Sequence, residues 1–183
     1  VGAFDESLWC HEDFEFGFRA LTHGVSVRFA HGADAEHRDG SDLAKILQRK
    51  RDEGRADVQL ARMHPSMTPA LPLGRPFAAS RAAGLMHRLA LRRSRVLDRL
   101  VPAALRASMA LFEALRMRDR WRTALYRAMD FCYWSGVRAE AGTAGEVRRL
   151  RASHPPFTGT TTEIDVLDGL PALESRLDRL RPD

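Results

Sequence analysis

The sequence predicts an α/β fold over its first third, followed by a mostly helical extension. Three observations favour this division of the 183 residues. Apolar residues recur every three or four positions after Glu12, and residues 25–30 then alternate apolar and polar side chains, a pattern typical of a strand. Four prolines fall between Pro65 and Pro76, as expected of a break between regions. Beyond them, helical spacing of apolar residues continues to about Gly136.

The first region, residues 1–64, is predicted to contain a helix, a strand and a second helix. The first helix should be short, because Gly24 suits the position just after its end. The strand is predicted over residues 25–30. The polar turn at 39–42 then supplies a cap for the second helix, which is predicted to run to about Met63.

Composition divides the rest of the chain into three further segments. Residues 65–76 are predicted to form a Pro-rich linker. Residues 77–142 are predicted to form a basic helical extension of two long helices, the second of which starts at Pro102 because proline suits the first turn of a helix. Residues 143–183 are predicted to form a linker, one strand and one short helix, which could begin another domain because they are too few for a core of their own.

The positive charge of the chain is concentrated in one segment. The net charge is +5, but residues 75–151 alone carry 17 arginines against 6 acidic side chains. Such a block indicates an anionic partner, and a basic amphipathic helix is typical of a membrane surface. We therefore expect residues 77–135 to meet an anionic membrane surface, whereas nucleic acid is disfavoured because the arginines lack interleaved aromatic residues. Alternatively, the arginines form a solvated surface, or the helices simply pack on each other or on the rest of the protein.

The expected compartment is the cytoplasm, with a peripheral position at the inner face of the membrane as one variant. Cys10 and Cys132 are too few for a disulfide framework. The sequence has no apolar run of the roughly 20 residues that would span a bilayer, and no signal peptide pattern. The chain opens on Val1 and runs at once into its most specific motif, so we expect it to be part of a longer protein.

Carboxylates near the N-terminus form that motif. Residues 4–6 read Phe-Asp-Glu, and the pair Glu12 and Asp13 follows at the start of the first predicted helix. A histidine, His37, comes after the predicted strand. Carboxylates at a helix start, together with a histidine from the next strand, could form a site with a general base and a metal ion.

The order of these motifs resembles the second half of the catalytic domain of family 2 glycosyltransferases. The resemblance implies a GT-A, Rossmann-like fold, of which residues 1–64 would be the C-terminal part. It also implies an enzyme that transfers a sugar from a nucleotide-sugar donor to a hydroxyl group of a glycan or a lipid-linked acceptor. The nucleotide-binding half with its Asp-x-Asp motif should precede Val1, so the chain alone is expected to be an inactive fragment.

The resemblance also implies roles for five residues. Asp13 would be the base that deprotonates the acceptor hydroxyl, and Glu12 would orient the acceptor. Trp9 would stack on the acceptor sugar, and Arg19 belongs to the same substrate-binding motif. His37 would be a ligand of Mn²⁺ or Mg²⁺, which stabilises the departing diphosphate.

Each feature also has a simpler explanation. Glu12 and Asp13 would favour the helix dipole without any catalysis, and Glu15 with Arg19 has the i, i+4 spacing of a surface ion pair. The chain as a whole could be a non-catalytic basic module that binds anionic lipid or nucleic acid. A third alternative is a metal site, unrelated to sugars, formed by His11, Glu12, Asp13 and His37.

Overall fold

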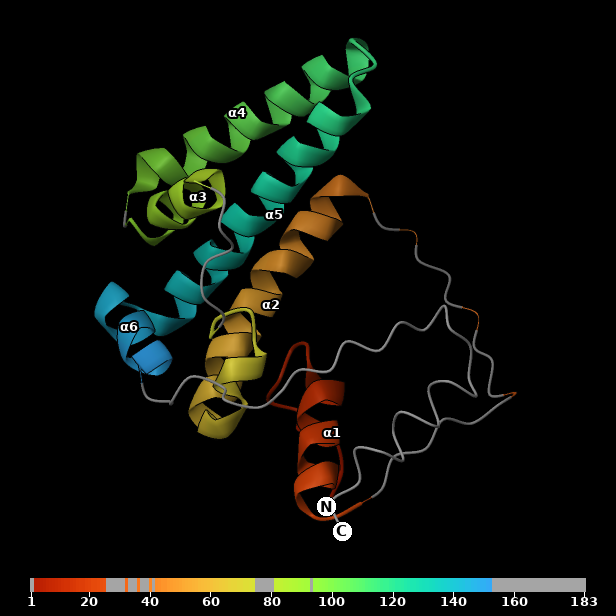
Figure 1. The fold of residues 1–183 in the computed structure, drawn as a ribbon, viewed down its shortest axis with the longest axis vertical. Helices are drawn as coiled ribbons and strands as arrows, with labels where there is room; N and C mark the ends of the chain where they lie inside the picture. The colour runs from red at the N-terminus through yellow and green to blue at the C-terminus, as the bar shows by residue number, and fades with distance from the viewer. Residues whose placement is uncertain are drawn as a thin grey trace.

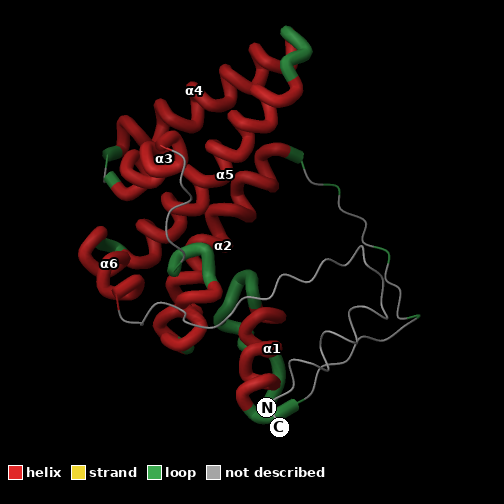
Figure 2. The backbone as a smooth tube through the Cα atoms, in the orientation of Figure 1, coloured by secondary structure: helices red, strands yellow, loops and turns green. Residues whose placement is uncertain are grey.

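The computed structural model describes residues 2–25, 42–74, 81–92 and 94–152, together with residues 32, 36 and 40. Within these residues the chain forms α-helices and one 3-10 helix, without any strand (Figures 1 and 2). The elements are α1 (Glu12–Thr22), α2 (Leu43–Met63), η1 (Pro65–Ala70), α3 (Arg81–Leu91), α4 (Arg95–Ala114), α5 (Arg118–Ala141) and α6 (Ala144–Ala152).

The predicted α/β, Rossmann-like GT-A fold is therefore wrong for the part of the chain that the structure describes. The prediction depended on the family resemblance and, within residues 1–64, on one alternating stretch, and all of that stretch beyond Val25 lies outside the described residues. The strand and helix predicted beyond residue 152 lie outside them as well. Elsewhere, apolar residues recur at helical spacing, so helices pack on helices and no sheet is needed to cover them.

The two helices predicted in the first region are confirmed. Helix α1 ends at Thr22, and Gly24 follows with φ of 75°, a backbone conformation that glycine adopts without strain. Helix α2 begins after Asp42, whose side chain accepts a hydrogen bond from the backbone N–H of Lys45 at 2.8 Å. Asp42 therefore supplies the predicted cap.

The two long helices predicted after residue 77 are three helices in the structure. Ser94 caps α4 by accepting a hydrogen bond from the Leu97 N–H at 3.4 Å, which separates α3 from α4. Pro102 consequently lies inside α4 and not at its start. A second break follows Ala114, where Arg116 takes a positive φ of 54° before α5 begins.

Helices α2 and α5 form the centre of the molecule and lie side by side in Figure 1. Two glycines bring their backbones into direct contact. A Cβ on Gly54 would lie 2.1 Å from the Tyr133 carbonyl oxygen, and one on Gly136 would lie 1.9 Å from the Arg51 carbonyl oxygen. No other residue type fits at either position without moving the helices apart.

One hydrophobic core contains residues from all four segments that were predicted to be separate. Leu60 of α2 and Val137 of α5 are fully buried in it, together with Leu73, which lies in the segment predicted to be a linker. Val147 of α6 joins the same cluster. The described residues therefore pack as one helical body, in which η1 and residues 71–74 contribute to the core. Among the described helices, none is both long enough and apolar enough to cross a membrane.

Candidate functional site: a groove beside the carboxylate pair

A groove of about 1550 Å³ opens between the loop that precedes α1 and the first half of α2. One wall comes from the predicted motif and includes Trp9, Glu12 and Asp13. The opposite wall comes from α2, with a contribution from α4. Its polar side chains are Lys45, Gln48, Arg49, Lys50, Asp52 and Glu53, together with Arg106 of α4. The groove therefore places exposed carboxylates across from several cations.

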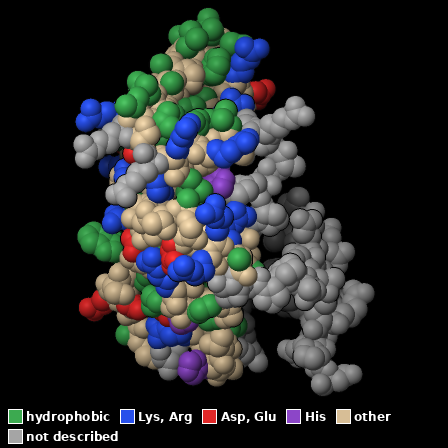
Figure 3. Space-filling view, turned by 90° about the vertical axis from the view of Figure 1, so that its left-hand side faces the viewer, with side chains coloured by type: hydrophobic (Ala, Val, Ile, Leu, Met, Phe, Trp, Pro, Cys, Tyr) green, Lys and Arg blue, Asp and Glu red, His purple; other side chains and the backbone are tan. Residues whose placement is uncertain are grey.

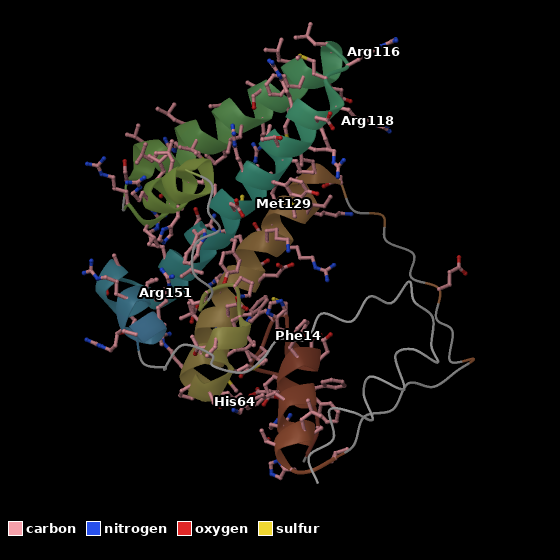
Figure 4. The ribbon with its side chains drawn as sticks, viewed as in Figure 1. Phe14, His64, Arg116, Arg118, Met129 and Arg151 are labelled. Atoms are coloured by element: carbon pink, nitrogen blue, oxygen red, sulfur yellow. The ribbon has the colours of Figure 1, made fainter. Side chains whose placement is uncertain are left out.

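Three of the predicted site residues line this groove. Glu12 and Asp13 are exposed in the first turn of α1, and Asp13 Oδ1 accepts a hydrogen bond from the Phe14 N–H at 2.9 Å. Trp9 is 92% exposed, so it is not part of the core of the described residues. Figure 4 labels Phe14 at the end of α1 that carries this pair.

A buried carboxylate fixes the start of α1 against the helical body. Asp57 of α2 is completely buried, and its Oδ1 lies 3.1 Å from His11 Nδ1. Its second oxygen accepts a hydrogen bond from the Tyr133 hydroxyl of α5. A buried carboxylate needs such partners, because burial without them costs several kcal/mol. His11 directly precedes Glu12, so this network holds the carboxylate pair at the edge of the groove.

The network also shifts the pKa values of its members. The hydrogen bond to Asp57 raises the pKa of His11 above its usual 6.5, although burial acts in the opposite direction. Burial, reinforced by Asp57, raises the pKa of Tyr133 well above 10. The hydroxyl therefore stays protonated and donates to Asp57. His11 itself adopts φ of 65°, which is unusual for a residue other than glycine and is compensated by these contacts.

A second buried carboxylate fixes the middle of α1. Glu15 is 2% exposed, and its Oε1 accepts hydrogen bonds from Arg19 Nε at 2.6 Å and from His64 Nε2 at 2.8 Å. The bond from Arg19, followed by that from His64, lowers the pKa of the Glu15 carboxyl. Figure 4 shows His64 next to α1, at the C-terminal end of α2. The pair Glu15 and Arg19 is thus part of a buried network and not only an ion pair on the surface.

Arg19 and His37 are the two predicted site residues that the structure does not place in the groove. The Arg19 guanidinium bonds to Glu15 and also donates to the Ala3 carbonyl oxygen at 2.6 Å, so it ties the N-terminal loop to α1. His37 lies outside the described residues. Among the described residues there is no group of three or more metal-binding side chains, so a site for Mn²⁺ or Mg²⁺ remains a prediction that depends on His37.

Sequence reasoning missed the residues that hold α1 in place, namely Asp57, Tyr133 and His64. For Asp57 a signal was present. It lies three residues after Gly54 and one before Val58, on the face of α2 that packs on α5. A carboxylate at such a core position requires a buried partner. No comparable signal identified the partner, because Tyr133 lies 76 residues away.

Comparisons with known proteins give no relative for this chain. No family model matches the sequence, and neither a curated protein nor a solved structure matches it. The functional argument therefore depends on the motif and on the groove that it lines.

Proposed function

We propose that this chain supplies the acceptor side of a glycosyltransferase site. The observation that carries the proposal is the groove, whose one wall combines a carboxylate pair with an exposed indole and whose other wall carries four cations beside Asp52 and Glu53. Transfer of a sugar to a hydroxyl acceptor requires a base, which a carboxylate can supply, and cations can stabilise the departing phosphates. The order of motifs in residues 2–37, which resembles family 2 glycosyltransferases, supports the same reaction.

The proposed chemistry is the attack of an acceptor hydroxyl on the anomeric carbon of a nucleotide sugar. As the new C–O bond forms, the hydroxyl proton passes to the Asp13 carboxylate, and the bond to the diphosphate breaks with its electron pair. Glu12 would hold the acceptor hydroxyl near Asp13. Both carboxylates are exposed at the groove, as a group that must reach a bound substrate has to be.

The other groove residues fit the remaining parts of the two substrates. Trp9 offers a flat apolar ring, 92% exposed, on which a sugar ring could stack. Lys45 and Arg49 lie on the opposite wall, where they could bind the phosphates of the donor or of a lipid-linked acceptor. A divalent cation held through His37 would supply further stabilisation of the departing diphosphate.

The test is nucleotide-sugar turnover by the protein encoded by the complete reading frame, with Asp13→Asn as the variant. Loss of a general base typically lowers the rate by about 10²- to 10⁴-fold. Asp119→Asn is a matched control, because Asp119 is also an acidic residue in the first turn of a helix, α5, and lies outside the groove. Wild-type turnover by Asp13→Asn would refute the assignment of the base. If the only effect of both variants were an equal, small loss of stability, Asp13 would be explained by the helix dipole alone.

A further inference from the structure

Helix α4 has apolar side chains on two opposite faces. Its inner face packs on the rest of the helical body through Met109, which is buried, and through Leu105 and Phe112, which are partly buried. Its outer face carries large apolar side chains that nothing in the described structure covers. These are Val96, Leu100, Leu111 and Leu115, which are between 55% and 61% exposed.

The outer side chains form one continuous stripe. At 100° per residue, Val96, Leu100 and Leu111 fall within about 60° of each other around the helix axis. The exposed alanines 103, 107 and 114 lie between them on the same side. A helix that is apolar on both faces is expected to be covered on both. The outer stripe of α4 is therefore a surface that calls for a partner.

Arginines border this stripe. Arg99 and Arg106 are exposed along one of its edges. Where α4 turns into α5, four more exposed arginines follow within seven residues, accompanied by a single acidic residue, Asp119. They are Arg116, Arg118, Arg120 and Arg122. Figure 4 labels Arg116 and Arg118 at this turn, and Figure 3 shows hydrophobic and basic side chains together at the same end of the molecule.

We propose that this surface, the outer face of α4 with the arginines of the α4–α5 turn, binds an anionic phospholipid membrane. The apolar stripe would enter the boundary between headgroups and acyl chains, and the guanidinium groups would pair with lipid phosphates. Charge complementarity selects this partner, since the described arginines 99, 116, 118, 120 and 122 have no ion pair with another described residue. Nucleic acid would leave the apolar stripe uncovered, and the outer face of α4 offers no aromatic ring for stacking on bases. The inference is independent of the glycosyltransferase proposal.

The test is co-sedimentation of the purified chain with vesicles of phosphatidylcholine, with or without phosphatidylglycerol. We expect binding to the anionic vesicles that falls as salt rises. The double variant Leu100→Asp/Leu111→Asp should lose affinity by about tenfold or more, because charges replace two exposed leucines that would enter the membrane. Arg118→Gln and Arg122→Gln should each weaken binding by about fivefold. Leu21→Asp is the matched control, because Leu21 is 60% exposed but lies on α1.

Three results would overturn the proposal. The first is absence of binding to anionic vesicles by the folded chain, with folding checked by circular dichroism. The second is a stripe variant that binds as tightly as Leu21→Asp. The third is a different occupant of the surface. Light scattering that shows a dimer, broken by Leu100→Asp/Leu111→Asp, would assign the surface to a second copy of the chain. Binding of duplex DNA in place of vesicles would assign it to nucleic acid.

Discussion

His11, beside α2, and His87, beside α5, experience opposite electrostatic environments. His11 lies beside the buried Asp57, which also binds Tyr133, and its pKa is raised above 6.5. His87 lies with its ring centroid 4.3 Å from that of Trp134, the next residue of α5. There, partial burial, reinforced by the nearby Arg151 and Arg88, lowers the pKa of His87 to about 4.

This contrast follows from the uneven distribution of charge along the sequence, because differently charged segments form different regions of the structure. The motif region, residues 1–74, carries 12 acidic and 9 basic side chains, and two of its carboxylates are buried. They stabilise the packing of α1 by accepting hydrogen bonds from His11, His64 and Arg19. In the Arg-rich region from α3 to α6, partial burial, reinforced by Arg151 and Arg88, lowers the pKa of His87 and keeps its ring neutral above about pH 4. The α2–α5 pair joins the two regions.

The largest effect on stability should come from disrupting the contact between α2 and α5. In the double variant Gly54→Ala/Gly136→Ala, the two new methyl groups would lie 2.1 and 1.9 Å from backbone carbonyl oxygens of the facing helix. Overpacking of this kind costs up to about 3 kcal/mol per site, so we expect a loss of up to about 6 kcal/mol in the free energy of unfolding, measured with urea. Gly84→Ala is the control, because its Cβ meets nothing within 4 Å. It should stabilise α3 by about 0.5–1 kcal/mol, and equal stability of the two variants would contradict the close backbone contact.

The next largest effect on stability should come from removing the buried carboxylate of Asp57. Asp57→Ala leaves His11 and Tyr133 without their buried acceptor, and breaking a buried pair costs about 3–5 kcal/mol. The measurement is again urea unfolding. Asp52→Ala, on the same helix, is the matched control: its carboxylate, on the groove wall, accepts hydrogen bonds from the exposed Gln48 and forms an ion pair at 4.0 Å with the exposed Arg55. The control should change stability by less than about 0.5 kcal/mol; a similar loss for both variants would show that Asp57 has no special role.

A smaller effect should appear as opposite pH dependences of the two histidines. The pKa of His87 is depressed in the folded state, so acid favours the unfolded state from pH 6.5 down to about 4, with a slope below about 1.4 kcal/mol per pH unit. The pKa of His11 is raised, so its contribution is complete below pH 6.5 and is lost as pH rises through the raised value. Urea unfolding across this range should show that His87→Gln removes the acid slope and that His11→Gln removes the loss at higher pH. Unchanged slopes in both variants would count against the two environments.

Local signals in the sequence predicted α1 and α2, because Gly24 and Asp42 mark their boundaries by known backbone and capping preferences. The helix breaks at Ser94 and Arg116 were missed. Arg116 takes its positive φ without being glycine, so composition gives no warning of that turn. The α/β prediction failed because neither a short motif that resembles a known family nor a single alternating stretch specifies a sheet.

The sequence also predicted part of the candidate site. Trp9, Glu12 and Asp13 are close in the chain, so the motif indicated them together, and they line one groove. The opposite wall and the anchors of α1 come from residues far along the chain, such as Tyr133. Only tertiary packing brings these residues to the motif, and no local pattern encodes it.

Helix α1 is docked on the helical body through His11 and Asp57, which places Glu12 and Asp13 at the groove. The most direct test is an NMR titration of the histidine ring protons in the wild-type chain and in Asp57→Asn. The account predicts a His11 pKa above 6.5 that falls in the variant, while the pKa of His87 stays at about 4 in both proteins. If His11 titrates at 6.5 in both proteins, Asp57 does not hold α1 in place. The placement of Glu12 and Asp13 at the groove, on which the proposed function depends, would then be wrong.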